Sequence, residues 1–266
     1  MNRLFEHFEG FDRSKRRRIE DCFHEYSAGY DTSDPKIKLK IDHTYRVAGL
    51  CDRIAGSIGA DRDFAWLCGM LHDVGRFEQI RRYNTFVDAA SVDHAQFGAD
   101  LLFKEGLIER FEIEPEEQWL GLLERVIRNH SLYRLEPGLS EEEQKYCNIL
   151  RDADKVDIFR VNCDTPPEEI YNVTTEQLVN SSVSEEVKEC FRGRTAVLRS
   201  LKKYPADFIV GHICLVFELV YPISAEIARE QGYLDRMLGF RSENEETQEW
   251  FRYVRENVWC DGIIRR

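Results

Sequence analysis

Apolar side chains recur along most of this chain at spacings of three and four residues, the period of an amphipathic α-helix. No segment of useful length alternates apolar and polar residues, as a half-buried strand would. The pattern predicts an all-α fold with irregular connections over residues 27–35 and 77–92. The predicted helices cover residues 14–26, 41–58, 61–71, 93–103, a segment that starts at Glu114, and residues 141–161, 167–171, 185–201, 208–219, 221–238 and 247–258.

Ionisable side chains interrupt these apolar stripes at positions where the helical period predicts burial. One such residue alone is most simply a hydrogen-bonded core side chain. Six of them from five helices point to a metal site, because buried ionisable groups are costly unless they are paired or bind a metal. Imidazole and carboxylate ligands suit Fe, Mn, Zn, Co or Ni. The six are His43, His72, Asp73, His94, His130 and Asp154.

Composition narrows the class of protein. The 266 residues, 42% of them hydrophobic, are enough for one large domain or for one domain with an appendage, and we expect a single domain over residues 1–266. The net charge of −12 argues against a nucleic acid polymer as partner. Eight cysteines without a Cys-x-x-Cys pair indicate reduced thiols, and neither a signal peptide nor an 18-residue apolar segment is evident. We therefore expect a cytoplasmic protein without a membrane partner.

The order His...His-Asp...His...His...Asp resembles the HD-domain superfamily of metal-dependent phosphohydrolases, from about Ile41 to Phe159. The additional histidines, in Asp93-His-Ala-Gln-Phe-Gly98 and Ile127-Arg-Asn-His-Ser131, resemble the branch that binds two metals. The resemblance implies an HD-domain helical bundle with its metal-binding core over residues 36–162. Further helices over residues 185–266 would pack on that core, although a contact with a partner or a second copy is an alternative for them.

Carried over residue by residue, the resemblance implies one metal on His43, His72, Asp73 and Asp154. A second metal would lie on His94 and His130, with Asp73 bridging the two. Of the neighbouring acids, we expect Asp152 to be solvated and Asp157 to lie behind the ligands. The ions would be divalent or iron-type, with Fe, Mn, Zn, Co, Ni and Mg not distinguished.

The resemblance also implies hydrolysis of a phosphomonoester or phosphodiester of a small, nucleotide-like molecule by a metal-activated hydroxide. Arg76 stands where a related branch has lysine, and is the first candidate to grip the substrate phosphate. Other HD enzymes have an acid there, which leaves the proton-transfer step open. Arg46 and Lys155 are weaker candidates that could equally be surface cations. Substrate choice would rest with the loop over residues 77–92 and the C-terminal helices.

Two other functions fit the same ligand set. Some HD-fold enzymes are di-iron oxygenases that act on a small polyol or phosphonate. A catalytically silent nucleotide-binding regulator is the third possibility, although six costly positions argue for a retained metal. The Gly-Tyr-Pro signature of the cyclic-dinucleotide branch is absent, which disfavours that class of substrate.

Overall fold

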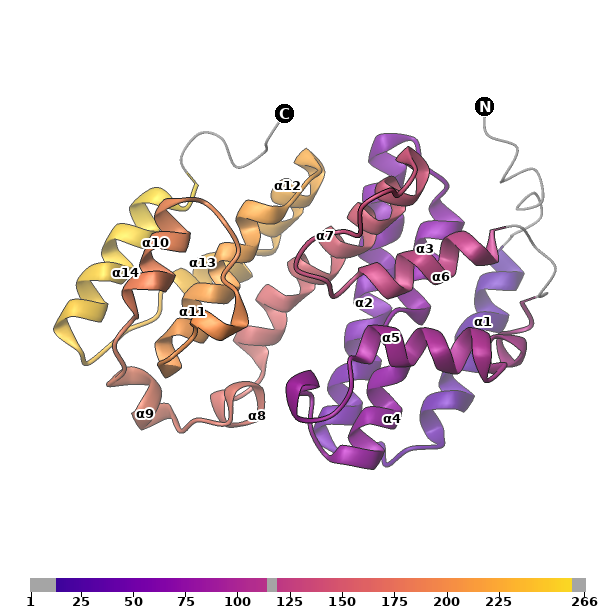
Figure 1. Ribbon diagram of the computed structural model, residues 1–266, viewed down its shortest axis with the longest axis horizontal. Helices are drawn as coiled ribbons and strands as arrows, with labels where there is room; N and C mark the ends of the chain where they lie inside the picture. The colour runs from indigo at the N-terminus through magenta and orange to yellow at the C-terminus, as the bar shows by residue number, and fades with distance from the viewer. Residues whose placement is uncertain (1–12, 114–118, 260–266) are drawn as a thin grey trace. The chain divides into compact units, whose positions relative to one another are not determined.

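The computed structural model describes residues 13–113 and 119–259 (Figure 1). Within these residues it contains helices and connecting turns and no strand, which confirms the all-α prediction. The helix predicted to start at Glu114 begins outside the described residues, and α6 is described from Leu120 to Asn129.

The chain divides into two compact units, Met1–Ala153 and Asp154–Arg266. The prediction of one domain, with a core over residues 36–162 and an extension over 185–266, stays a prediction. The first unit contains α1 (Arg13–Ala28), α2 (Pro35–Ile58), α3 (Arg62–Leu71), α4 (Val74–Tyr83), α5 (His94–Ala99), α6 and the first part of α7 (Glu141–Asp164).

Helix α2 begins six residues earlier than the apolar stripe predicted. Asp34 caps it by accepting a hydrogen bond from the Lys36 amide, and Pro35 occupies the first turn, where its missing N–H costs nothing. Helix α3 packs closely on α2, because a Cβ at Gly69 would lie only 2.5 Å from the Ala48 Cα. This close crossing brings the start of α2 to the end of α3.

Residues 77–83 are helical, so the prediction of one irregular connection from 77 to 92 was wrong for its first half. The apolar pattern did not predict helix α4, because the buried side of this helix includes the polar residues Glu78 and Gln79. Glu78 is buried, and its carboxylate forms ion pairs with Arg81 and Arg82. Beyond α4, the connection holds a short 3₁₀ turn, Asp88–Ala90, before α5.

The second unit is built from the rest of α7 and short helices. The helix predicted over 221–238 is two helices, because Gly232 adopts a left-handed φ of 69° between them. The helices are α8 (Pro167–Tyr171), α9 (Thr175–Val179), α10 (Glu185–Arg192), α11 (Pro205–Ile213), α12 (Pro222–Gln231), α13 (Tyr233–Leu238) and α14 (Glu245–Asn257).

Two expectations about the whole chain bear on compartment. Among the described residues, no helix is both long and apolar enough to cross a membrane. The seven cysteines in the described ranges are all free thiols, and four of them are buried. The cytoplasmic location stays a prediction.

Candidate metal centre

Four buried histidines surround the carboxylate of Asp73, which follows α3. Its Oδ2 lies 3.6 Å from His43 Nε2 and 3.4 Å from His72 Nε2. Its Oδ1 lies 3.6 Å from His94 Nε2 and 3.8 Å from His130 Nε2. Each carboxylate oxygen therefore faces its own pair of imidazoles.

The tautomers of three of these histidines follow from their outer hydrogen bonds. The Nδ1 atoms of His72 and His130 each lie 2.7 Å from a backbone carbonyl, those of Gly69 and Ile127. A carbonyl can only accept, so each Nδ1 carries the proton and each Nε2 presents a lone pair. His94 does the same toward Asp88, with Nδ1 2.7 Å from Oδ2. Three Nε2 lone pairs thus point inward.

Two of the imidazoles, those of His72 and His94, favour the neutral form in this environment. Burial lowers the pKa of His94 to about 4, and burial also lowers the pKa of His72. Burial alone would raise the pKa of Asp73, but the charge of Lys40 outweighs it and holds the pKa of this carboxyl well below its usual range. Neutral imidazoles beside an ionised carboxylate are the protonation states that metal binding requires.

No hydrogen bond links the atoms of His94, His130 and Asp73 that face one another, because none of these atoms carries a proton. His94 Nε2 and His130 Nε2 lie 3.1 Å apart, and both present lone pairs. Asp73 Oδ1, beside them, is buried and accepts no hydrogen bond from the described residues. A cation bound by these three atoms would satisfy all of them, so the donor set fits a metal.

Asp154 joins the first pair of histidines. His43, His72 and Asp154 each offer a ligand atom, and the three atoms lie within 4.8 Å of one another. His72, Asp73 and His130 form a second such group. Asp154 lies on α7, whose continuous helix carries it directly on from Ala153.

The neighbouring acids of α7 differ from expectation. Asp152 was predicted to be solvated, and this is wrong, because its exposed fraction is 0%. Asp157 is buried as well. Ala153 and Val156 are also fully buried, so this stretch of α7 is covered on more than one face and the apolar stripe could not separate solvated from buried acids.

Asp88 orients a ligand, and the sequence did not single it out. Asp88, Asp93 and His94 form a third group whose atoms are close enough to hold a metal. However, Asp93 caps α5 through the amides of Ala95 and Gln96, and Asp88 Oδ1 accepts from Arg76. Burial favours the neutral form of Asp88, but its bond to His94 and the charge of Arg76 prevail and depress its pKa. Its role is to hold the His94 ring.

Lys40 is the second residue that the sequence did not reveal. Its Nζ lies 2.6 Å from Asp73 Oδ2, and the residue is only 9% exposed. The sequence does contain a sign of it. Asp34-Pro35 is typical of a helix start, and a helix that begins there places Lys40 one turn before His43 on the same face. Lys40 therefore pairs with the carboxylate that both histidine pairs share.

Arg76 lies against the centre, where it was expected. Its Nη1 donates to Asp88 Oδ1 and Gln79 Oε1, each at 2.7 Å. Its Nε is buried without a hydrogen-bond partner in the described residues and lies 3.8 Å from Asp73 Oδ1. The half-buried ring of Phe86 lies 5.4 Å from Lys40 Nζ and 5.7 Å from Arg76 Cζ. Two cations and one aromatic ring thus border the histidines.

The weaker substrate candidates remain predictions. Arg46 is half-buried on α2, one turn beyond His43. The Nζ of Lys155 lies 3.4 Å from the Glu218 carbonyl oxygen in the second unit. Neither observation assigns a role in the site.

Comparison with known protein families gave one match: residues 41–158 match the family model described as "HD domain". This range encloses the six predicted ligands, Lys40 lying just before it. The match confirms the resemblance stated from the histidine and aspartate order. Searches of the curated proteins and of the solved structures found no match.

Proposed function

We propose that this chain, whose residues 41–158 match the HD-domain family model, is a metal-dependent phosphohydrolase. Its substrate would be a phosphomonoester or phosphodiester of a small, nucleotide-like molecule. HD domains are a family of metal-dependent hydrolases, and this chain presents groups of histidine and aspartate able to hold a metal.

One observation carries the proposal: the two oxygens of Asp73 face two separate pairs of histidines. We infer that His43, His72 and Asp154 hold one metal, that His94 and His130 hold another, and that Asp73 is shared. Metals there would lower the pKa of a bound water toward neutrality and offset charge on a phosphate.

The remaining residues would position the substrate. A guanidinium donates hydrogen bonds in a fixed fork that matches phosphate oxygens, so Arg76 would bind the phosphate and would not be the general acid or base. Its buried Nε has no hydrogen-bond partner among the described residues and could donate to a phosphate oxygen. Lys40 supplies a second cation, and the exposed part of Phe86 offers a flat surface for a base or other ring beside them.

The proposal is tested with protein purified without added metal or chelator. We would quantify bound metals, measure phosphate release from a panel of phosphoesters, and record oxygen uptake. We expect bound metal and phosphatase activity, and we expect His72→Ala to lower that activity by a factor of about 10² or more. His24→Ala, an exposed histidine on α1, should leave the activity unchanged.

The other outcomes separate the rival functions. Oxygen consumption by the iron-loaded protein without phosphatase activity would identify an oxygenase and contradict the proposal. If neither phosphate release nor oxygen uptake is detected and the protein binds a nucleotide tightly, it is a regulator, and this result would also contradict the proposal.

A further inference from the structure

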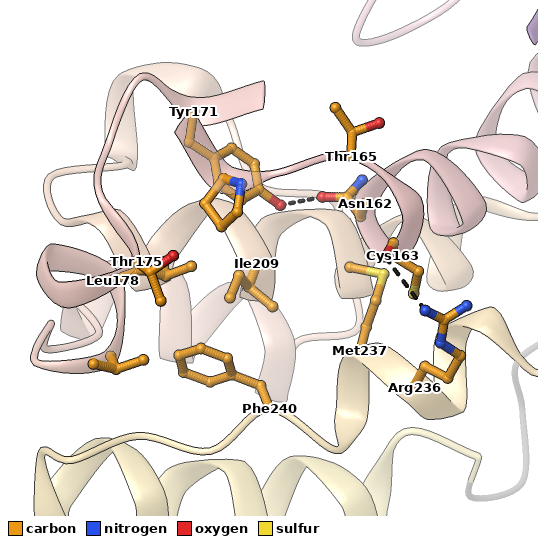
Figure 2. Close-up of a pocket in the computed structure, with 12 residues that line it drawn as sticks. Asn162, Cys163, Thr165, Tyr171, Thr175, Leu178, Ile209, Arg236, Met237 and Phe240 are labelled. Atoms are coloured by element: carbon orange, nitrogen blue, oxygen red, sulfur yellow. Dashed lines mark hydrogen bonds between the residues drawn. The ribbon is translucent and has the colours of Figure 1, made fainter. Parts of the chain in front are cut away.

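The second unit contains a cavity of about 390 Å³ that is separate in sequence from the histidine cluster (Figure 2). All of its lining residues lie between 162 and 240, within one compact unit. Small-molecule sites span roughly 300–1,000 Å³, so the cavity is large enough for a compact ligand.

One wall of the cavity is apolar. Leu178 on α9, Ile209 on α11 and Met237 on α13 contribute side chains that are buried in the fold and border the cavity. In Figure 2 the rings of Tyr171 and Phe240 lie on either side of Ile209. This wall would bind the body of a ligand by excluding water from apolar surface.

Several uncharged polar groups of the cavity are already hydrogen-bonded within the fold. Asn162 Oδ1 accepts from the Tyr171 hydroxyl and from His212 Nδ1, the latter at 2.7 Å. Asn162 Nδ2 donates to the Ile158 carbonyl at 2.7 Å. The Cys163 thiol donates to the Tyr233 carbonyl. These groups have little hydrogen-bonding capacity left for a ligand.

Arg236 is the only charged residue among those that line the cavity. Burial raises the pKa of Tyr171 and of Cys163, so neither adds negative charge at neutral pH. Arg236 pairs with Asp164 at 3.3 Å, but Asp164 also pairs with Arg160 at 3.1 Å. Two guanidiniums share this carboxylate. Arg236 Nη2 also donates to the Cys163 carbonyl at 3.3 Å, and the other N–H groups of its five-donor guanidinium can serve a ligand.

We propose that this cavity binds a small amphipathic anion. The ligand would place a compact apolar body, such as an aromatic ring system, against Leu178, Ile209 and Met237. A single carboxylate on that body would pair with Arg236. The proposal does not rest on the function proposed for the histidine cluster. A polyphosphate would need more cations than the lining provides, and an uncharged polar ligand would find fewer uncharged hydrogen-bonding side chains than apolar side chains there.

The chain has its own reporters for a binding test. It contains three methionines, of which Met237 lines the cavity and Met70 is fully buried on α3 in the other unit. The full chain would be labelled with methyl-¹³C methionine and titrated with 2-naphthoate, and separately with the uncharged 2-naphthamide. We expect saturable shifts of the Met237 signal, an unmoved Met70 signal, and about fivefold tighter binding of the carboxylate.

Two variants test the two halves of the proposal. Arg236→Gln should reduce the affinity for naphthoate to that for the amide, whereas Arg252→Gln, an exposed arginine of α14, should not. Thr175→Trp, at the exposed start of α9 on the cavity lining, should weaken both probes. The proposal is wrong if the Met237 signal does not shift, if Met70 shifts instead, or if Arg236→Gln leaves naphthoate binding unchanged.

Discussion

At the scale of single residues, Asp73 and its neighbours determine what the centre can bind. The positions of the four histidines could be predicted because each lies on an apolar helical stripe, where an imidazole is conspicuous. Asp88 lies in a loop without a helical period, and Lys40 lies just before the apolar stripe that marked its helix, so the stripes indicate neither residue. A lysine near a helix start and an aspartate in a loop are ordinary surface residues until the fold brings them to Asp73 and His94.

Lys40→Met should destabilise the metal-free protein by about 3 kcal/mol, because the change leaves a buried carboxylate without its cation. With metal bound the loss should be much smaller, since the metal offsets the charge of Asp73. Urea unfolding with and without manganese measures both values, and Lys38→Met, exposed on the same helix, is the control. Equal losses in the two conditions would show that Lys40 does not substitute for a metal.

Lys202, in the second unit, destabilises the folded state by an amount that depends on pH. Burial lowers its pKa to about 8, whereas an unfolded lysine titrates near 10.4. Between about pH 8 and 10.4 the unfolded chain holds a proton that the folded chain has lost, so stability rises with pH through this window. Below pH 8 both states are protonated, and the cost of the buried charge is fully present.

Lys202→Met should therefore stabilise the protein at pH 7 by about 2 kcal/mol. Its advantage over the wild type should shrink as the pH rises from 8 to 10. Urea unfolding at several pH values measures the difference, with the exposed neighbour Lys203→Met as control. A constant advantage across this range would mean that Lys202 does not titrate as described.

At the scale of elements, Gly75 on α4 and Gly98 on α5 determine how closely these two helices approach. A Cβ at Gly75, in the first turn of α4, would lie 2.5 Å from the His94 carbonyl oxygen and 2.6 Å from the Gly98 nitrogen. Both are backbone atoms, so α5 would have to move and carry His94 with it. The spacing between α4 and α5 thus controls the second histidine pair.

Gly75→Ala should cost about 2 kcal/mol of stability by overpacking. Its effect on metal binding should be selective: affinity at the His94 and His130 pair should fall more than at His43 and His72. Calorimetric metal titration separates the two steps. Gly49→Ala is the control, because a Cβ there meets no atom within 4 Å and alanine favours a helix. Equal weakening of both steps would contradict this account.

The sequence predicted most helices but not all of their limits, for physical reasons. Helix α4 has only Val74, Phe77 and Ile80 as buried apolar side chains of any size, too few to define a period. The break at Gly232 requires a left-handed backbone that apolar spacing does not reveal. Helix ends depend on caps and glycine, whereas helix existence depends on the apolar stripe.

At the scale of the whole molecule, no linker segment marks the boundary between the two units. It falls within the continuous helix α7, so neither composition nor apolar period changes there. The net charge of −12 gives no sign of local cations, although Lys40 and Arg76 lie beside the histidines and Arg236 lines the cavity of the second unit. Both ligands proposed for this chain therefore rest on a few basic residues within an acidic protein.

The measurement that tests the central claim most directly is the metal content of Asp73→Asn. Wild type and variant would be loaded with manganese, desalted and analysed for metal per chain, with folding checked by circular dichroism. If Asp73 is shared by two metals, the wild type should retain two ions, His94→Ala about one, and Asp73→Asn close to none. A folded Asp73→Asn protein that retains both ions would contradict the shared-carboxylate centre.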